Sequence, residues 1–489
     1  MTRLYCKTNS LAKYLIQILT ILVVVYSLSS CEDEKYLNSN DVQLKFSVDT
    51  VMFDTIFTTI GSTTRHLKIY NPYSEKVLIS KVSLAGGDAS SFRLNINGIV
   101  GNEAFNIEVP AKDSIYVFVE VTVDPNGQDL PMVIKDSIIF TTNANVQDIS
   151  LIAWGQDFNL IRSEVIKTTT WTDQKPYLVY NYAYVDSLET LTIEAGAKIF
   201  FHKGAGLYAK GTIIAEGTFE KQIVFQGDRL ENDYKQIPDQ WSGIMLFSGS
   251  HGNVFNYTNI RNANIGLQVG TLEQEGKATV SITNSRIENM AYAGIFSLKS
   301  DIFAYNIVVA NCGFYTTALL VGGSYEFYHS TMANYWGRYS TRNTSSLVIS
   351  NVLIVENSNG SKVEYLGALE KATFGNCIIY GNNNLEVELG HNEDVAFNYL
   401  FDHCILQVPD TFRTSDKVHY NNVWKGMKYD PIFINPFENN YELDTLSPAK
   451  DVGSLVYSEM FPVDLNNVSR IDDNGPDLGA FERVENDNE

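Results

Sequence analysis

The feature that most restricts the fold of this chain is a short unit that recurs at nearly constant spacing. In each unit two apolar or small residues stand two positions apart, which places both on one face of a strand. One such unit cannot bury its inner face alone, so the repeat predicts strands that stack coil upon coil. The separations are 27, 22, 23, 22, 25 and 27 residues. The later members of the pairs are Ile260, Ile287, Val309, Met332, Ile354, Ile379 and Leu406.

Asn closes most of these units, as is typical of corners between stacked strands. Asn tolerates the left-handed backbone conformation that a sharp corner requires. Stacked Asn side chains can also share amide hydrogen bonds along an axis. We therefore interpret these residues as corners, and a row of ligand-binding amides is the alternative. They are Asn262, Asn289, Asn311, Asn334, Asn357 and Asn382.

The start of the repeat region carries family motifs. Residues 191–201 read LTIEAGAKIFF and residues 207–218 read LYAKGTIIAEGT, and QIVF and QWSGI follow at 222–225 and 240–244. This stretch resembles the entry coils of the right-handed parallel β-helix (pectate-lyase-like) family. The resemblance implies a β-helix over residues 161–425.

The tail over residues 426–489 has a signature of its own. DPIF at 430–433 and PDLGAFE at 476–482 resemble the C-terminal element found after many bacterial β-helices. An open end of a β-helix would expose backbone groups, so we expect the tail to be a cap. Three of its charged residues are then expected in turns and ion pairs rather than in catalysis: Asp451, Arg470 and Asp477.

Residues 43–160 read as short alternating strands separated by turns, for example SIYVFV at 114–119 and SIIF at 137–140. About seven strands over about a hundred residues indicate an immunoglobulin-like β-sandwich. IYNP at 69–72 and FTTN at 140–143 resemble the abnormal-spindle/Hydin type of that fold. The expected fold class is all-β: this sandwich, then a right-handed parallel β-helix with a C-terminal cap.

The first 30 residues have the character of an export signal. A basic start precedes the apolar run YLIQILTILVVVY at 14–26, which is short for a membrane-spanning helix. LSSC at 28–31 resembles the bacterial lipobox, in which the signal is cut before the Cys and that residue is acylated. The resemblance implies that residues 1–30 are removed and that Cys31 carries palmitate-type chains as an outer-membrane anchor. A plain signal peptide with an incidental Cys is the alternative.

The segment 31–42 is expected to be an acidic tether. EDEK at 32–35 resembles the surface-export signal of lipoproteins in glycan-degrading Gram-negative anaerobes. We therefore predict a protein that faces outward from the outer membrane, and a tether facing the periplasm is the alternative. The whole chain has a net charge of -21, which argues against nucleic acid as a partner.

Catalytic residues are expected at equivalent positions of neighbouring coils, because hydrolases of this fold need two or three carboxylates that converge on the substrate. The residues that precede the corner Asn have no common character: Arg261, Glu288, Ala310, Ala333, Glu356 and Gly381. No pair of His or Cys has zinc-site spacing. The sequence therefore predicts no catalytic residue, no metal site and no cofactor.

An acidic patch is the one candidate for a cation. Glu386, Glu388, Glu393 and Asp394 lie within one segment. Ca²⁺ takes six or more oxygen ligands, so a calcium site belongs here only if the protein is an enzyme. We otherwise expect a solvated loop.

Ligand binding is expected at two loops. The insertion NYWGRYSTRN at 334–343 offers exposed aromatic faces with polar edges, which suit sugar rings or a protein partner. Trp336 lying down over the β-helix as a plug is the alternative. The loop over 227–240 lies next to Trp241, which we expect in the core. The predicted binding residues are Tyr335, Trp336, Arg338, Tyr339, Arg342, Arg229 and Tyr234.

These observations lead to three hypotheses of function. The first is a surface lipoprotein that binds glycans or an outer-membrane protein complex without catalysis. The second is a β-helix polysaccharide lyase or glycoside hydrolase. The third is a structural component of the cell envelope. An enzyme would show a groove with converging carboxylates and an Arg or Lys, and a binding protein would show an aromatic or polar patch.

Overall fold

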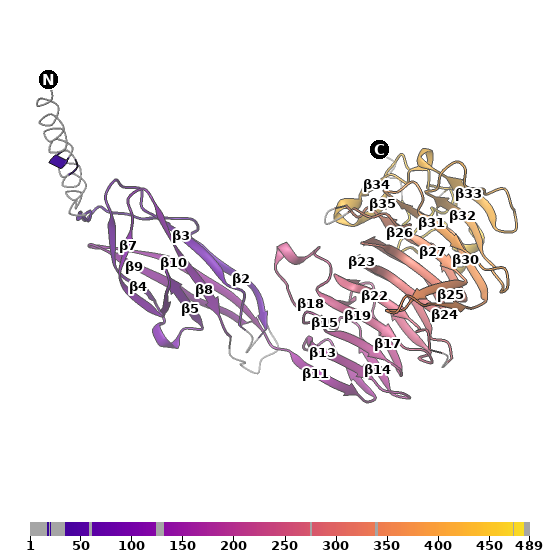
Figure 1. Cartoon of the computed structure of the whole chain (residues 1–489), viewed down its shortest axis with the longest axis horizontal. Coiled ribbons are helices and arrows are strands. Elements are labelled where there is room, and N and C mark those ends of the chain that lie inside the picture. Colours follow the sequence, from indigo (N-terminus) through magenta and orange to yellow (C-terminus); the bar gives the residue numbers. More distant parts are fainter. Residues whose placement is uncertain are drawn as a thin grey trace, which may run out of the picture. The chain divides into compact units, whose positions relative to one another are not determined.

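The computed structural model describes residues 17, 18, 20, 35–57, 61–123, 132–273, 276–337, 341–472 and 474–483. The chain divides into two units, Met1–Gln156 and Asp157–Glu489, with separate cores (Figure 1). Most of the predicted signal, Cys31 and residues 32–34 lie outside the described residues. In the part of the chain that is described, no helix is long and apolar enough to cross a membrane.

The N-terminal unit is an immunoglobulin-like β-sandwich of two five-stranded sheets. Along one strand Ile115, Val117 and Val119 are buried while Tyr116 and Phe118 are exposed, so the predicted alternation forms the inner face. One sheet has the order β1 (Lys45–Phe46), β3 (Arg65–Tyr70), β8 (Ser114–Val121), β5 (Phe92–Ile96), β6 (Ile99–Gly101). The other has the order β2 (Thr50–Phe57), β10 (Asn145–Gln156), β9 (Met132–Thr142), β4 (Val77–Leu84), β7 (Glu103–Val109).

The C-terminal unit is a parallel β-helix in which each coil adds strands to three faces. It begins with β11 (Asn159–Ile166), β12 (Thr169–Trp171), β13 (Tyr177–Val185) and β14 (Thr190–Glu194). Parallel pairing then continues from coil to coil through a sheet of 21 strands. This regular stacking explains the near-constant spacing of the sequence repeat.

The long strands turn corners, so one strand can serve two or three faces. The first face contains β15 (Lys198–Phe201), β18 (Ile223–Gly227), β21 (Thr258–Arg261), β26 (Thr331–Asn334) and parts of β23 (Thr279–Met290), β24 (Ala293–Cys312), β30 (Leu369–Gly381) and β32 (Leu400–Leu406). The second face contains β16 (Gly206–Ala209), β19 (Trp241–Leu246), β22 (Ala263–Val269), β27 (Leu347–Ser350), β31 (Val387–Gly390) and parts of β24 and β25 (Tyr315–Tyr328). The third face contains β17 (Thr212–Glu216), β20 (Asn253–Asn256), the start of β33 (Tyr420–Lys425) and the remaining parts of β23, β24, β25, β30 and β32.

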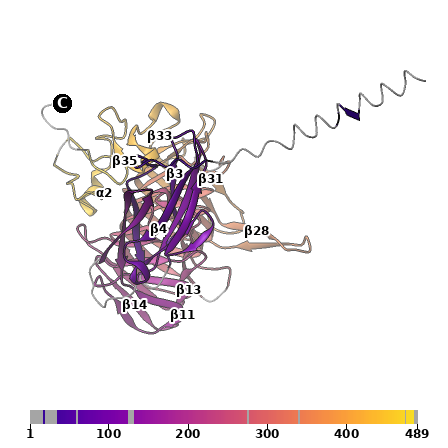
Figure 2. The same cartoon turned by 90° about the vertical axis from the view of Figure 1, so that its left-hand side faces the viewer.

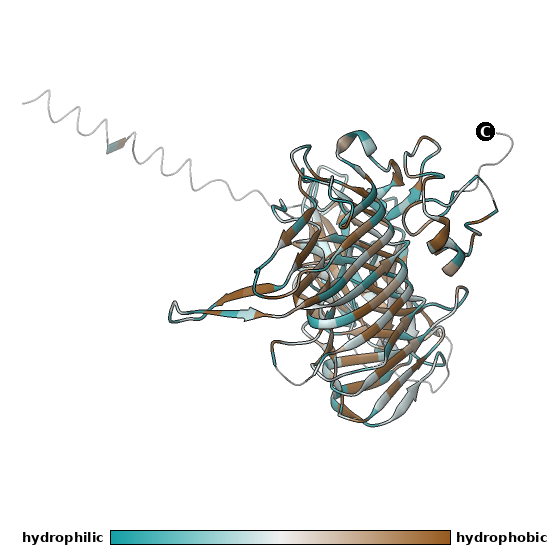
Figure 3. Cartoon of the chain, turned by 90° about the vertical axis from the view of Figure 1, so that its right-hand side faces the viewer, coloured by the Kyte–Doolittle hydropathy of each residue, from teal (hydrophilic) through white to brown (hydrophobic). Residues whose placement is uncertain are grey.

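The interior of the β-helix is a stack of like side chains. Phe327 and Phe374 stack at 5.3 Å between ring centroids, and Phe374 and Phe401 at 4.9 Å. Cys377 and Cys404 are in register on adjacent strands as buried free thiols, as their positions in the repeat predict. Figure 3 shows the alternation of hydrophobic and hydrophilic residues along these strands.

The predicted Asn corners are confirmed where consecutive faces meet in a tight bend. Asn262, Asn289 and Asn311 have φ angles of 66°, 61° and 51° between the first and second faces. Asn334 and Asn382 do not have positive φ, because the chain leaves the coil there and enters loops. A second column of left-handed corners, between the third and first faces, comprises Asn284, Asn306, His329, Asn376 and His403.

One predicted coil is wrong. Val352, Ile354 and Asn357 belong to a two-stranded antiparallel hairpin, β28 (Val352–Glu356) and β29 (Lys362–Leu366), that projects from the β-helix (Figures 2 and 3). Ile354 is 59% exposed, and β25 pairs directly with β30 beyond the excursion. The spacing of two fits either face of any strand, so the pattern could not distinguish a hairpin from a coil.

The C-terminal segment covers the flank of the β-helix, which corrects the expectation that it would cap an open end. Outward-facing apolar residues of the first face pack against β34 (Phe433–Asn435), β35 (Asn440–Leu443) and residues 478–481. The short helix α2 (Leu455–Met460) adjoins the third face, where Tyr457 donates to Asp402 at 2.8 Å. The outward apolar residues are Val308, Ala310, Ala333, Ile378, Tyr380 and Ile405. The cap therefore buries a side that would otherwise expose an apolar patch.

The charged residues of this segment hold it together, as predicted. Arg470 forms an ion pair with Glu482 at 3.2 Å, and both side chains are fully buried. Asp477 accepts a hydrogen bond from the backbone N–H of Asp451 at 2.8 Å. Asp451 itself takes a left-handed turn conformation, with φ of 56°.

Candidate ligand-binding pocket

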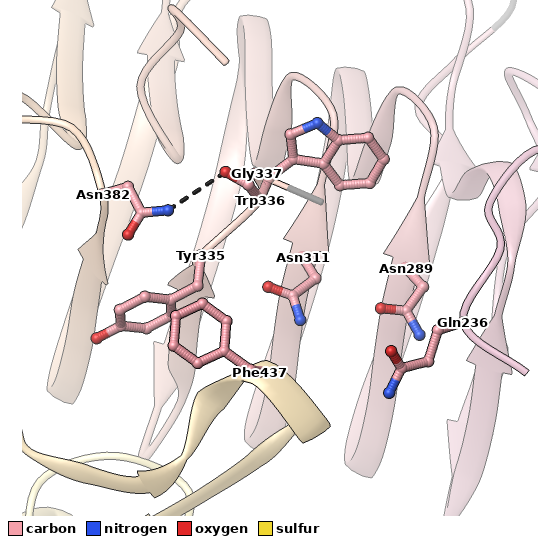
Figure 4. Close-up of a pocket in the computed structure, with 8 residues that line it drawn as sticks. All are labelled: Gln236, Asn289, Asn311, Tyr335, Trp336, Gly337, Asn382 and Phe437. Atoms are coloured by element: carbon pink, nitrogen blue, oxygen red, sulfur yellow. Dashed lines mark hydrogen bonds between the residues drawn. The ribbon is translucent and has the colours of Figure 1, made fainter. Parts of the chain in front are cut away.

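A pocket of about 430 Å³ opens beside the Asn corners between the first and second faces. Its described lining contains three aromatic side chains and four amides, with no charged group. The residues are Gln236, Asn289, Asn311, Tyr335, Trp336, Gly337, Asn382 and Phe437 (Figure 4). The volume is within the range of small-molecule sites, about 300–1,000 Å³.

Three segments far apart in sequence build the pocket. Tyr335 and Trp336 directly follow β26, Gln236 lies in the loop before β19, and Phe437 lies in the 3₁₀ turn η4 (Pro436–Glu438) of the C-terminal segment. Two predicted binding loops therefore contribute to one site. In Figure 4, Trp336 and Phe437 lie on opposite sides of the Asn311 side chain.

Trp336 is half-buried and forms a wall of the pocket. A Cβ atom at Gly313 would lie 3.4 Å from Cζ2 of Trp336, so the indole packs over that glycine. Asn382 Nδ2 donates to the Trp336 carbonyl at 3.3 Å, and Asn334 Oδ1 accepts from the Trp336 N–H at 3.4 Å. One edge of the indole is thus covered, as the plug alternative expects, and the remainder lines the pocket; the contact of Trp336 with a ligand stays a prediction.

Tyr335 joins the insertion to the C-terminal segment. Its ring lies 6.1 Å from that of Phe433 and 6.4 Å from that of Phe437. Burial raises the pKa of the Tyr335 phenol, with the charge of Asp430 acting in the same direction. The phenol is therefore neutral and can serve as a hydrogen-bond donor.

The back of the pocket is an amide wall, by which we mean Asn289, Asn311 and the bridging Asn439. Asn439 Nδ2 donates to Asn289 Oδ1 at 3.4 Å, and Asn439 Oδ1 accepts from Asn311 Nδ2. Oδ1 of Asn311 is buried without a hydrogen-bond partner. The wall therefore encloses one acceptor without a partner among the described residues.

Arg342 does not contact the pocket, which corrects the prediction of a ligand contact. Its side chain is 1% exposed and forms a bidentate pair with the fully buried Glu386, at 2.8 and 2.5 Å. Arg342 also donates to the carbonyl of Asn334 at 3.0 Å, at the start of the insertion. It is thus a positioning residue that closes the base of the loop carrying Tyr335 and Trp336.

Glu386 is the exception to the predicted solvated acidic loop, since it is buried while Glu388, Glu393 and Asp394 are exposed. It accepts hydrogen bonds from the hydroxyl and N–H of Ser346 at 2.7 and 2.9 Å and from the N–H of Asn383 at 2.8 Å. All its acceptor capacity faces the protein interior. Among the described residues, no group of three or more His, Cys, Asp or Glu side chains is placed to hold a metal ion.

Arg229 and Tyr234 lie in the second predicted loop, away from the pocket. The Arg229 guanidinium lies 3.7 Å from the Tyr234 ring centroid and 2.9 Å from Glu231. They line a separate hollow of about 60 Å³, together with Arg261. Asn262 anchors this loop by donating to the carbonyls of Tyr234, Lys235 and Ile237.

The remaining predicted binding residues, Arg338 and Tyr339, lie outside the described residues. Sequence reasoning missed Gln236, Phe437 and Asn439 as parts of the site. Phe437 follows a Pro in the tail, and its 73% exposure is the property that the sequence did not reveal. Asn289, Asn311 and Asn382 were predicted as corners; they line this pocket, and their alternative interpretation as ligand-binding amides stays a prediction.

A second hollow lies on the third face, and we call it the third-face trough. It measures about 340 Å³ and is lined by hydroxyl groups, by Phe303 and by the carboxylates of Asp301 and Glu326. Lys371 pairs with Glu326 at 2.7 Å. Burial acts to raise the pKa of Glu326, but hydrogen bonds from Lys371 and Tyr328 outweigh it, and the pKa is lowered.

A further carboxyl lies behind the amide wall. Glu288 is 6% exposed and lies 3.3 Å from Arg286, which in turn stacks on Phe481 of the C-terminal segment. Burial raises the pKa of Glu288, although Arg286 acts in the opposite direction. The C-terminal segment covers this ion pair, since Arg286 contacts both Phe481 and the carbonyl of Asn439.

Comparison with known proteins supports the fold. Residues 179–332 match the family described as a right handed beta helix region, which confirms the predicted handedness. No curated protein matches the chain. A family 123 glycoside hydrolase from Clostridium perfringens, studied for glycolipid glycan hydrolysis, aligns over 23% of this chain and 26% of its own, with 7% identity and a TM-score of 0.17. The catalytic domain of a GH87 alpha-1,3-glucanase, in complex with nigerose, aligns over 73% of this chain and 82% of its own. The two share 10% identity, with a TM-score of 0.16. Likenesses this weak carry no argument about function.

Proposed function

We propose that this protein is an outer-membrane lipoprotein, anchored through Cys31 and facing outward, that binds glycans without catalysis. The observation that carries the proposal is the pocket, where three aromatic rings and four amides converge from distant segments. Aromatic faces suit the C–H faces of sugar rings, and amides suit hydroxyl groups, since each amide both donates and accepts. The corners of the β-helix supply a rigid base for such a site.

Binding to purified oligosaccharides and to extracted cell-envelope glycans tests the proposal. We expect the chain that begins after Cys31 to bind at least one glycan in titration calorimetry. Trp336→Ala and Phe437→Ala should weaken binding at least about tenfold, because aromatic side chains of this kind dominate binding energies. Phe219→Ala, at an exposed ring remote from the pocket, is the matched control and should bind normally. Equal binding by all variants would show that the glycan does not bind in this pocket.

An outer-membrane protein complex is the second class of partner under the same proposal. The projecting hairpin β28–β29 and the β-sandwich offer surfaces for such contacts. Co-purification from detergent-solubilised outer membrane tests this class. Isolation of the chain alone, under conditions that preserve known complexes, would exclude a stable partner.

A second candidate function is a polysaccharide lyase or hydrolase, and the third-face trough favours it. Carboxylates and a lysine meet there, as Lys371 and Glu326 show. We would then expect polysaccharide cleavage, in the presence and absence of Ca²⁺, that Glu326→Gln abolishes. A product with new unsaturation would establish a lyase and overturn the non-catalytic proposal.

A further inference from the structure

The chemistry of the pocket wall restricts the kind of glycan that fits. We infer that the pocket takes a neutral, hydroxyl-rich sugar and discriminates against the corresponding uronic acid. The inference rests on the proposed function and specifies the substrate class of that same site. It follows from the described lining residues, which offer paired donors and acceptors and carry no formal charge.

The first step concerns hydrogen-bond matching. The lining amides of Asn289 and Asn382 are each partly engaged within the protein: Asn289 Oδ1 accepts from Asn439, and Asn382 Nδ2 donates to the Trp336 carbonyl. The N–H₂ half of the first and the carbonyl oxygen of the second therefore provide a donor and an acceptor. A sugar hydroxyl both donates and accepts, so neighbouring hydroxyls can satisfy this donor and this acceptor. A carboxylate only accepts, so it can pair with the N–H₂ half alone. These lining amides are therefore matched to hydroxyl groups.

The second step concerns the partial and formal charges behind the amide wall. Oδ1 of Asn311 is buried and unpaired, so its partial negative charge is not offset by a donor. Two described cations lie behind the wall: Arg342 is enclosed and pairs with Glu386, and Arg286 donates to the carbonyl of Asn439 at 3.4 Å. Glu288 lies behind the same corner, and Arg286 pairs with it. An anion in the pocket would find no cation among the described lining residues, and removing it from water without a counter-charge is costly.

The third step concerns the apolar surfaces. Trp336 and Phe437 border the amides on opposite sides of Asn311 (Figure 4). A pyranose ring has C–H groups on its faces and hydroxyls around its rim. It can therefore place its faces on the rings and its rim on the amides in one pose. A linear polyol or a peptide lacks this combination of flat faces and polar rim.

The experiment is titration calorimetry of the chain lacking its lipid with short neutral gluco-, galacto- and manno-oligosaccharides. Each is paired with its C6-oxidised counterpart, which differs by a carboxylate in each oxidised ring. We expect at least one neutral member to bind and its oxidised counterpart to bind at least about tenfold more weakly. Equal or tighter binding of the oxidised member would overturn this inference and leave the glycan-binding proposal intact. Binding of no member and of no envelope glycan would overturn both.

Substitutions at Asn382 sharpen the test, because this exposed residue follows β30 and lines the pocket. Asn382→Lys adds a cation to the pocket and should narrow the preference for the neutral sugar, while Asn382→Asp should widen it. Phe219→Ala should leave the ratio of the two affinities unchanged. A ratio that does not respond to either charge at residue 382 would place the sugar elsewhere and contradict the inference.

Discussion

Glu386 and Arg342 show, at the scale of single residues, how burial changes what a charged side chain does in the structure. Both belong to segments that look solvated in the sequence, yet the structure encloses both side chains and joins them in a bidentate pair. The pair lies beneath the insertion that carries Trp336. Because a buried ion needs its partner, the loop and the coil beneath it are energetically linked.

We predict that Glu386→Ala lowers the free energy of unfolding of the β-helix unit by about 3–5 kcal/mol, because it leaves the Arg342 charge buried and unpaired. Chemical denaturation followed by tryptophan fluorescence measures this loss. The double variant Arg342→Met/Glu386→Met should recover much of the stability, since no charge is then left unpaired. Lys221→Ala, at an exposed pair with Asp173, is the control and should change nothing measurable. An equally stable Glu386→Ala variant would contradict the burial of the pair.

His329 gives a prediction about pH. Burial, together with the charge of Arg470, holds the pKa of His329 well below its usual 6.5. Below pH 6.5 the unfolded chain therefore binds a proton that the folded chain does not, so stability falls as the pH falls. The limiting slope is about 1.4 kcal/mol per pH unit for one proton.

The stacked corner residues suggest the matched variant, His329→Asn, since Asn306 and Asn376 occupy the same column. We expect this variant to lose less stability than the natural chain between neutral and mildly acidic pH. Denaturant unfolding at several pH values measures the difference. Parallel pH profiles for the two proteins would show that His329 is not the group responsible.

At the scale of elements, the hairpin β28–β29 is an excursion from an otherwise continuous stack. Its strands pair with each other, and β25 pairs with β30 across the point of departure. Asn351 fixes the base, since its Nδ2 donates to the carbonyls of Asn392 and Val395. The exposed apolar residues Ile354, Val363 and Leu366 contribute nothing to the core.

We predict that replacing residues 352–366 by a short Gly-containing loop leaves the β-helix folded, because no core residue is removed. Circular dichroism and thermal unfolding should be close to those of the natural chain, and glycan binding should persist because the hairpin does not line the pocket. As a comparison, deletion of 369–381 removes β30 and should abolish folding. Loss of the fold on removal of the hairpin would show that β28 is part of the stack.

At the scale of the whole molecule, the two units have separate cores, and the expected lipid anchor precedes them both. More than one acyl chain is needed for stable anchoring. We predict that Cys31→Ala moves the protein from the membrane fraction to the soluble fraction. Fractionation and immunoblotting measure this, and a membrane-bound Cys31→Ala protein would rule out the lipid anchor.

Protease treatment of intact cells should cleave the natural protein if it faces outward.

The sequence by itself determined the all-β class, the sandwich, the coil repeat and the left-handed corners at Asn262, Asn289 and Asn311. These depend on local spacing, on periods of two and of about one coil, and on the backbone preference of Asn. It also indicated the insertion containing Tyr335 and Trp336, since an aromatic cluster between coils interrupts the repeat.

Only the tertiary structure decided what those features do together. Phe437 and Gln236 reach the same pocket as Trp336 because stacking and the packing of the C-terminal segment bring distant loops to one corner, and no local pattern encodes that convergence. The same holds for Arg342 and Glu386, which are 44 residues apart and meet because successive coils lie side by side. The repeat specifies which residues face inward. Which loops cover the outside, and which charges they enclose, depends on contacts between coils.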